Sequence, residues 1–169
     1  MSRNPRYDIL FDPIQIGPVK TKNRFYQVPH CTGMGYRMPQ TLAGMRGMKA
    51  EGGWGVVNTE YCSIHWTSDD TPFQSAQVWD QDDMRGNALM VEQVHEHGAL
   101  AGIELFHGGA YAANNFSRLP PIGRASIPAG QLNEPMQAQA MDKADIREFR
   151  RWHREAAVRS MEAGYDIVY

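Results

Sequence analysis

The chain has 169 residues, of which 42% are hydrophobic and 21% charged, and its formal net charge at pH 7 is -2. This composition is typical of a globular domain and excludes a disordered or collagen-like chain. A near-neutral balance without basic runs gives no electrostatic footprint for nucleic acid. No apolar run approaches the roughly 18 residues that cross a bilayer.

The N-terminus and the cysteines together indicate a cytoplasmic protein. The first residues, MSRNPRYDILFDP, lack the apolar segment of a secretory signal. Cys31 and Cys62 are too few for a disulfide scaffold. We therefore expect a reducing compartment, in which each cysteine needs its own explanation.

Strand and helix signals alternate along the first hundred residues. Short β-rich runs over Ile9–Phe25 flank Gly17-Pro18, which predicts a hairpin. The elements expected next are a strand over 25–28 ended by Pro29, a loop over 30–35, a helix over 41–51, a strand over 55–62, a polar stretch over 63–83 and a helix over 84–97. Gly98 is a suitable residue to end that last helix.

The alternation continues to the end of the chain. The run 100–105 is continuously apolar apart from one acidic residue, as buried parallel strands are. The stretch 107–140 is rich in Gly, Pro and Asn and accommodates no element of normal length, so we expect a long loop. Asp142 is expected to cap a helix that runs to Ala163, and 166–169 begins a fourth strand.

Strands separated by helices predict a parallel α/β sheet. An open doubly wound sheet and a (β/α)8 barrel are the two architectures with this order. No G-x-G-x-x-G motif follows a strand, which favours the barrel. Because a barrel needs about 250 residues, we expect residues 1–169 to be the first half of a (β/α)8 TIM barrel, preceded by an N-terminal β-hairpin and truncated in the fourth strand.

Barrel enzymes carry their catalytic groups at the carboxyl ends of the strands. Here those positions are Pro29-His30-Cys31, Glu60-Tyr61-Cys62 and Glu104-Leu105-Phe106-His107. They bring a thiol, an imidazole, a phenol and carboxylates to one rim. No H-x-x-H or C-x-x-C spacing occurs, so we expect no metal site.

Each of these residues has a structural and a functional interpretation. Cys31 is either a small buried hydrophobe or a reactive thiol beside a cofactor, and its place at a strand end favours the thiol. Cys62 fits the buried interpretation. Glu104 is costly in an apolar strand unless it is bonded, so either a helix terminus or an arginine satisfies it, or it accepts N–H groups of a cofactor, which we favour. Tyr61 either packs or presents its ring to a cation.

The remaining histidines carry less information. His95, His97 and His153 fall on expected helices, where a structural or solvated role is the ordinary one. His65 and Trp66 fall in a loop, and the pattern assigns them no role.

Five runs resemble one group of flavoenzymes: ILFDPIQIG, NRFYQVPHC, KAEGGWGVVNTEYCSI, VHEHGALAGIEL and AGYDIVY. They are similar to the trimethylamine/dimethylamine/histamine dehydrogenase group of the Old Yellow Enzyme class. The resemblance implies an FMN-binding barrel, with a [4Fe-4S] cluster and a nucleotide-binding region in a later part that these residues do not include. It also implies a homodimer that passes electrons to an electron-transferring flavoprotein.

The resemblance also implies roles for individual residues. Cys31 resembles the cysteine that forms a covalent thioether to C6 of FMN, and Val28, Pro29 and His30 resemble residues that line the flavin. Glu104 takes the position where ene-reductases have a glutamine at the pyrimidine edge. Tyr61 resembles an aromatic wall of the amine site, where the dimethylamine enzymes have glutamine. The family's catalytic tyrosine and histidine are expected beyond Tyr169.

The implied reaction is oxidation of a small tertiary amine such as trimethylamine, with N-demethylation to an aldehyde and a shorter amine. Two alternatives stay open at this point. One is an NAD(P)H-dependent ene-reductase with the same barrel. The other is an inactive truncated chain that binds FMN poorly, because the phosphate site of such barrels lies near strands seven and eight.

Overall fold

The computed structural model describes residues 4–69, 74–114, 116–129 and 136–169. Within those ranges, no helix has both the length and the apolar character needed to cross a membrane. The elements that follow are all drawn from this part of the chain.

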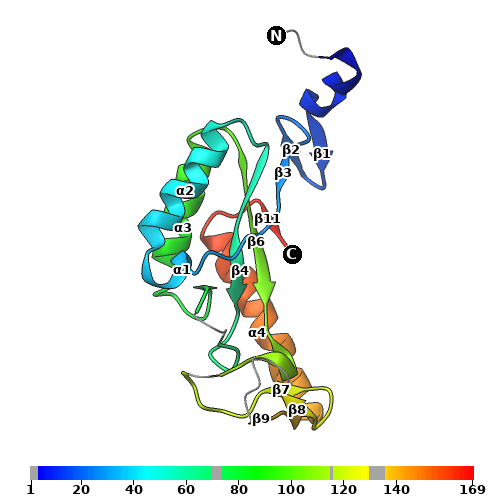
Figure 1. Ribbon diagram of the computed structural model, residues 1–169, viewed down its shortest axis with the longest axis vertical. Coiled ribbons are helices and arrows are strands. Elements are labelled where there is room, and N and C mark those ends of the chain that lie inside the picture. Colours follow the sequence, from blue (N-terminus) through cyan, green and yellow to red (C-terminus); the bar gives the residue numbers. More distant parts are fainter. Residues whose placement is uncertain (1–3, 70–73, 115, 130–135) are drawn as a thin grey trace.

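Four parallel strands form the centre of the fold (Figure 1). They are β3 (Tyr26–Gln27), β4 (Val56–Ser63), β6 (Leu100–Phe106) and β11 (Ile167–Val168). Their order in the sheet is the order in the chain, β3-β4-β6-β11. A doubly wound sheet reverses its strand order at a switch point, whereas a barrel does not. The order is therefore that of the first four strands of a barrel.

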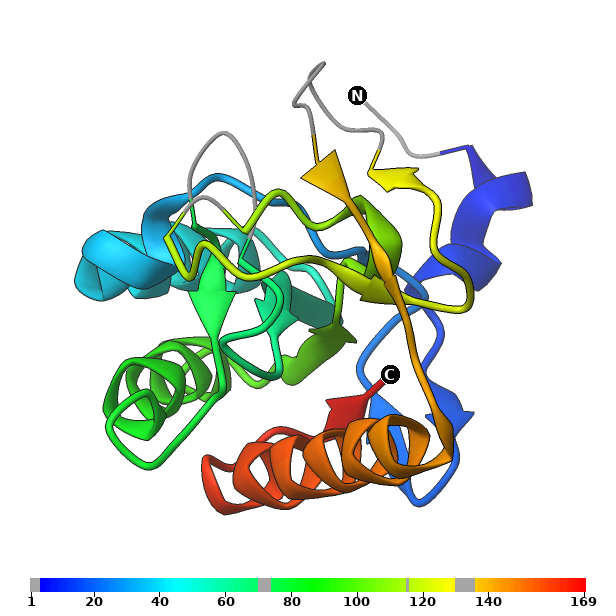
Figure 2. The same cartoon turned by 90° about the horizontal axis from the view of Figure 1, so that it is seen from below.

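Three long helices connect these strands and cover one face of the sheet (Figure 2). They are α2 (Pro39–Glu51), α3 (Met84–His95) and α4 (Lys143–Glu162). The main core lies between helices and sheet and includes Val57, Val94, Ile103 and Ala156, each at most 1% exposed. Since Ile103 faces the helices, the alternating neighbours Gly102 and Glu104 face the opposite side of the sheet.

The pairing of β4 with β6 contains one irregularity and one close approach. The register shifts between Asn58 and Tyr61, so that Tyr61 comes to lie beside Glu104. Asn58 lies beside Gly102, where an added Cβ would stand 2.1 Å from the Asn58 amide oxygen. Only glycine fits there, because the amide occupies the space that any side chain needs.

The expected N-terminal hairpin is confirmed, but it is shorter than the sequence pattern suggests. It consists of β1 (Ile14–Ile16) and β2 (Val19–Thr21), paired antiparallel. The residues Ile9–Phe11, expected to be β-rich, instead end a 3-10 helix, η1 (Pro5–Phe11). The Asn4 side chain accepts the Arg6 N–H and Pro5 opens the helix, a start signal that outweighs β propensity.

Other differences are confined to the connections. A short helix, α1 (Met34–Arg37), occupies the end of the expected loop, and α2 begins two residues early, at Pro39. A two-residue strand, β5 (Ala76–Gln77), pairs with β4 from within the polar stretch. In the described part of 107–140, no element exceeds three residues, which confirms that expectation: η2 (Gly109–Tyr111), β7 (Ile122–Gly123), β8 (Pro128–Ala129), β9 (Met136–Gln137) and β10 (Gln139–Ala140).

The start of α4 provides a test of the fold. The Asp142 carboxylate accepts the N–H groups of Ala144 and Asp145, and the Asp145 carboxylate accepts the Asp142 N–H in return. We expect Asp142→Ala to lower the free energy of unfolding by about 1 kcal/mol, the usual cost of losing such a cap. Urea denaturation followed by circular dichroism measures the change. Lys143→Ala, one exposed position later, is the control, and an equal loss in both variants would contradict the capping role.

Candidate functional site

The loop that carries Cys31 lies at the carboxyl end of the sheet. Tyr61 and Cys62 of β4 lie beside Glu104 and Leu105 of β6, and Cys62 also lies beside Ala76 of β5. Ser75 precedes Ala76, and its hydroxyl is 2.9 Å from the Cys31 sulfur. Through β5 and β4, these contacts connect Cys31 to the end of β6 where Glu104 lies.

The two cysteines differ in exposure. Both are free thiols, but Cys31 is half-buried in its loop, whereas Cys62 is 0% exposed. Burial raises the pKa of the Cys62 thiol well above its ordinary value. Cys62 is thus a core residue, as expected, and Cys31 is the thiol that a ligand can reach.

The residues between β3 and Cys31 lie open at the same rim. Val28 is 63% exposed, Pro29 is half-buried and the His30 side chain is exposed. An apolar side chain as exposed as Val28 at a strand end is suited to contact with a flat apolar ligand.

Glu104 is half-buried, and among the residues that the structure describes no donor binds its carboxylate. Neither an arginine nor a helix terminus within the described ranges satisfies this group, which was the first of the two explanations expected from sequence. A carboxylate is an acceptor-only group, so at this place it is open to the N–H donors of a ligand. The N–H at the pyrimidine edge of a flavin is such a donor, so the residue present fits that cofactor.

Tyr61 and Tyr169 place aromatic rings on either side of Glu104. The Tyr61 ring packs on Phe106, with ring centroids 4.6 Å apart. The Tyr169 carbonyl accepts the Leu105 N–H, which places Tyr169 next to Glu104 across the strand pair. Burial, and then the charges of Glu104 and Tyr26, raise the pKa of Tyr169 to about 12. The Glu104 side chain is thus flanked by rings, the setting that favours a flat or cationic ligand.

Sequence reasoning placed Glu60 at the rim without giving it a role, and it missed Arg46. Both are charged, both are 0% exposed, and both bond to the backbone around Cys31. Glu60 lies in the β-branched run VVNTEYC. Arg46 falls at a position of its helix that the spacing of the apolar residues assigns to the buried face. A charge within an apolar run was the available signal, and it was used for Glu104 but not for these two.

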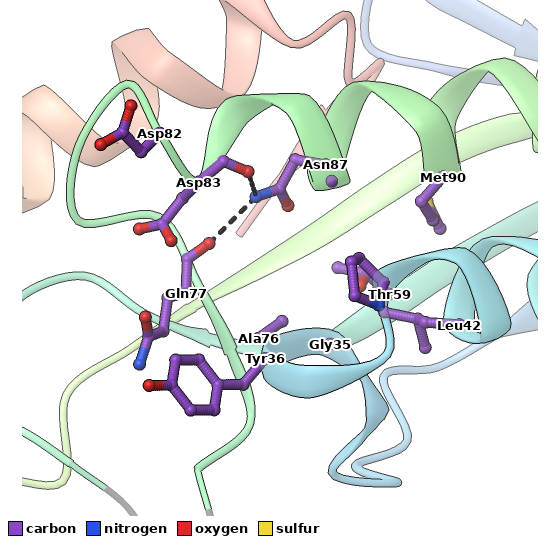
Figure 3. Close-up of a pocket in the computed structure, with 12 residues that line it drawn as sticks. Gly35, Tyr36, Leu42, Thr59, Ala76, Gln77, Asp82, Asp83, Asn87 and Met90 are labelled. Atoms are coloured by element: carbon purple, nitrogen blue, oxygen red, sulfur yellow. Dashed lines mark hydrogen bonds between the residues drawn. The ribbon is translucent and has the colours of Figure 1, made fainter.

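A small cavity of about 120 Å³ lies behind the Cys31 loop, between α1, α3 and β5 (Figure 3). Gly35 and Ala76 border it, and Asn87 closes it by donating to the carbonyls of Gln77 and Asp83. A Cβ on Gly35 would stand 2.4 Å from the Ala76 Cβ, so the loop requires glycine there. The cavity is lined partly by α2 and α3, so it belongs to the packing that supports the loop rather than to the Glu104 face.

His65 and His107, to which the sequence pattern assigned no specific role, belong to one hydrogen-bonded chain. The Gly109 N–H donates to His107 Nδ1, and His107 Nε2 is 3.1 Å from the Thr67 hydroxyl. That hydroxyl is 2.9 Å from His65 Nδ1, which the Thr67 N–H also approaches. Both rings therefore carry their proton on Nε2, and a second proton on either Nδ1 would oppose a donor.

Trp152 of α4 packs against both of these imidazoles. Its ring stacks on His65, with centroids 3.7 Å apart and planes 6° apart, and lies 6.1 Å from His107. Burial lowers the pKa of both histidines to about 4. Arg151 and Arg159 lower the His65 pKa further, and His65 and His153 lower that of His107. Both rings are neutral at pH 7.

This pair of histidines predicts a loss of stability in acid. Between the ordinary pKa of 6.5 and about 4, the unfolded chain binds protons that the folded chain does not. The free energy of unfolding should therefore fall as pH drops through that window, by at most about 1.4 kcal/mol per pH unit for each histidine. Denaturation curves between pH 4 and 7 measure the slope.

The control for this prediction separates these histidines from exposed ones. His107→Gln removes one titrating ring and should flatten the acid slope, whereas His97→Gln, at an exposed position, should leave it unchanged. Equal slopes in all three proteins would show that the buried rings are not responsible.

No cluster of three or more His, Cys, Asp or Glu side chains suited to a metal occurs in the described ranges. The chemistry of the rim therefore consists of Cys31, Glu104, the two tyrosine rings and the buried charges behind them.

Comparison with known proteins gives a consistent result. Residues 9–169 match the NADH:flavin oxidoreductase / NADH oxidase family. The chain is 46% identical to dimethylamine dehydrogenase from Hyphomicrobium sp. (strain x) over 173 residues, covering 99% of this chain and 24% of that protein.

Two solved structures are similarly close. Histamine dehydrogenase from Rhizobium sp. 4-9 has a TM-score of 0.94 and 47% identity, covering 98% of this chain and 26% of its own. An amine oxidase acting on 6-hydroxypseudooxynicotine, from Pseudomonas geniculata N1, has a TM-score of 0.94 and 46% identity, covering 99% and 25%. The chain thus spans about a quarter of the length of these relatives. These matches confirm the fold expected from sequence, a part of an α/β barrel.

Proposed function

The chain belongs to the NADH:flavin oxidoreductase / NADH oxidase family, and from that premise we propose that the intact protein oxidises a small amine with FMN as its electron acceptor. The observation that carries the proposal is the pairing, at one end of the sheet, of an accessible thiol, Cys31, with a carboxylate, Glu104, that has no donor among the described residues. The names of the relatives, which include a dimethylamine and a histamine dehydrogenase, support the amine class.

The residues of this chain have distinct roles in the proposal. Val28, Pro29 and His30 line the flavin, Glu104 accepts the N–H of its pyrimidine edge, and Cys31 is its point of covalent attachment. When bound, FMN supplies the two-electron redox chemistry. The acceptor at Glu104 and the exposed apolar side chain of Val28 hold a planar ring system in one orientation.

The Tyr61 ring forms one wall of the amine site. Packed at a tilt against Phe106, it is held in place, and in this proposal the ring contacts the substrate cation. Holding the amine nitrogen in an aromatic, water-poor site orients the neighbouring C–H bond for oxidation. We propose a tertiary amine such as trimethylamine as substrate, with an aldehyde and the shorter amine as products.

Cys31 provides the test of covalent attachment. We expect acid-precipitated intact protein to retain its flavin, and Cys31→Ala to release all of it into the supernatant, because no other accessible thiol lies in the described ranges. Absorbance of the two fractions measures the attached share. Cys62→Ala is the matched control, and it should retain the flavin. Free flavin from the unaltered protein, or attached flavin in Cys31→Ala, would refute attachment at this residue.

The substrate class is tested by asking what changes the oxidation state of the flavin. We expect trimethylamine to bleach the oxidised flavin under anaerobic conditions. An enzyme of the ene-reductase type would instead be reduced by NADPH and reoxidised by an activated alkene. The second pattern, without the first, would replace our proposal with that alternative.

Tyr61 variants refine the same experiment. Tyr61→Ala should lower kcat/KM for trimethylamine by up to about thirtyfold, because loss of the ring face removes up to about 2 kcal/mol of transition-state stabilisation. Tyr61→Phe keeps the ring and should stay close to the unaltered protein. An equal loss in the two variants would show that the hydroxyl, and not the ring, contacts the amine.

The partners proposed for the intact protein follow from the resemblance alone. They are a second copy of the chain in a homodimer and an electron-transferring flavoprotein as acceptor. A [4Fe-4S] cluster outside these residues would connect the flavin to that acceptor, in a cytoplasmic setting.

A further inference from the structure

Cys31 lies between two peptide groups that are each bonded to a buried charge. The carbonyl of His30 accepts Arg46 Nη2 at 2.5 Å. The N–H of Thr32 donates to Glu60 Oε1 at 2.7 Å. One charge thus fixes the peptide before Cys31, and the opposite charge fixes the peptide after it.

Glu60 is the more extensively bonded of the two. Its carboxylate accepts five hydrogen bonds, four from backbone N–H groups and one from a hydroxyl. The donors are Thr32 N, Thr32 Oγ1, Met34 N, Gly35 N and Ala76 N. Four of these five donors belong to the residues directly after Cys31. The conformation of that loop is therefore set by one side chain of β4.

The fifth donor connects the same carboxylate to the opposite side of the thiol. Ala76 donates to Glu60 Oε2 at 2.9 Å. Its neighbour Ser75 is the residue whose hydroxyl lies 2.9 Å from the Cys31 sulfur. Glu60 thus holds both the segment that carries the thiol and the segment that contacts it.

Arg46 completes the arrangement from α2. Its other terminal nitrogen donates to the Gln27 side chain at 3.2 Å, so it connects the end of β3 to His30. Burial lowers the pKa of the Arg46 guanidinium, and the nearby Glu60 charge opposes that shift. Burying two charges is costly unless each is bonded and they offset one another. Here four of the five bonds of Glu60, and one of the two bonds of Arg46, go to the loop around Cys31.

We propose that Glu60 and Arg46 are positioning residues that hold the Cys31 thiol in the orientation required for attachment of the cofactor. Both act through the peptide groups on either side of Cys31. The proposal deepens the function proposed above and rests on it for the identity of the cofactor. The orientation of the thiol can nevertheless be measured without any flavin.

The first measurement uses intact protein prepared without flavin from riboflavin-depleted cells. Iodoacetamide alkylation of each cysteine is followed by mass spectrometry. In Glu60→Gln the amide cannot serve five donors, and loss of a charged acceptor weakens the loop, so Cys31 should react about tenfold faster. Cys62, 0% exposed in the core, is the internal control and should stay unreactive. Arg46→Lys, which keeps the charge but lacks the two separate terminal nitrogens that reach Gln27 and His30, should give the same pattern.

A variant that removes a single hydrogen bond serves as a control in case Glu60→Gln unfolds the protein. Thr32→Val removes one of the five bonds and keeps the backbone donor, so its Cys31 rate should lie between those of the unaltered protein and Glu60→Gln. Unchanged Cys31 rates in all three variants would overturn the proposal. Alkylation of Cys31 and Cys62 together would overturn it as well, because it would show that the buried charges support the whole fold and not this loop.

The second measurement uses the same variants with flavin bound. The share of flavin that stays with acid-precipitated protein should fall about tenfold in Glu60→Gln and less in Thr32→Val, while total flavin bound before precipitation stays the same. If the unaltered protein holds no covalent flavin, the proposed attachment fails, yet the alkylation rates still decide whether Glu60 and Arg46 position the thiol. If Glu60→Gln keeps its covalent flavin, the positioning role fails, and the attachment at Cys31 stands.

Discussion

Six residue pairs join β4 to β6, from Val56 beside Leu100 to Ser63 beside Phe106, and the positions of the site residues depend on this pairing. The shift after Asn58 brings Tyr61 level with Glu104. The close contact of Asn58 with Gly102 fixes the register, because a side chain on Gly102 would collide with the amide. A slip by one residue would turn Glu104 toward the helices and remove the carboxylate from the rim. The pairing of two strands thus determines which groups meet at the carboxyl end of the sheet.

Behind that rim, two buried charged side chains hold the Cys31 loop in place. Functional residues are often carried by surface loops, which are in general more mobile than the elements they connect. In this chain the Cys31 loop is instead bonded to Glu60 and Arg46, two side chains with no exposure to solvent. Their burial removes competition from water, which strengthens each hydrogen bond. The proposed attachment point therefore lies in the loop after β3, and the supports that orient it come from α2 and β4.

Much of the fold could be predicted from sequence because its signals are local. The helix over 41–51, the strand over 55–62 and the cap at Asp142 all follow from periodicity or from a start signal, and all are present. The segment Ile9–Phe11 was assigned wrongly, since a cap at Asn4 outweighed its β propensity. The bonds of Glu60 could not be predicted, because its donors lie up to 28 positions away and meet it only when β3, β4 and β5 are side by side. The same holds for His65 and His107, which Thr67 and Trp152 bring together from distant segments.

Stacked rings connect α4 to the end of the sheet. Trp152 lies against His65 and near His107. His107 follows Phe106 in the chain, and the Phe106 ring packs on Tyr61. Tightly packed aromatic side chains transmit displacement because they leave no free volume to absorb it. A substitution on α4 that displaces Trp152 therefore also displaces His65 and His107, although neither histidine lies on that helix.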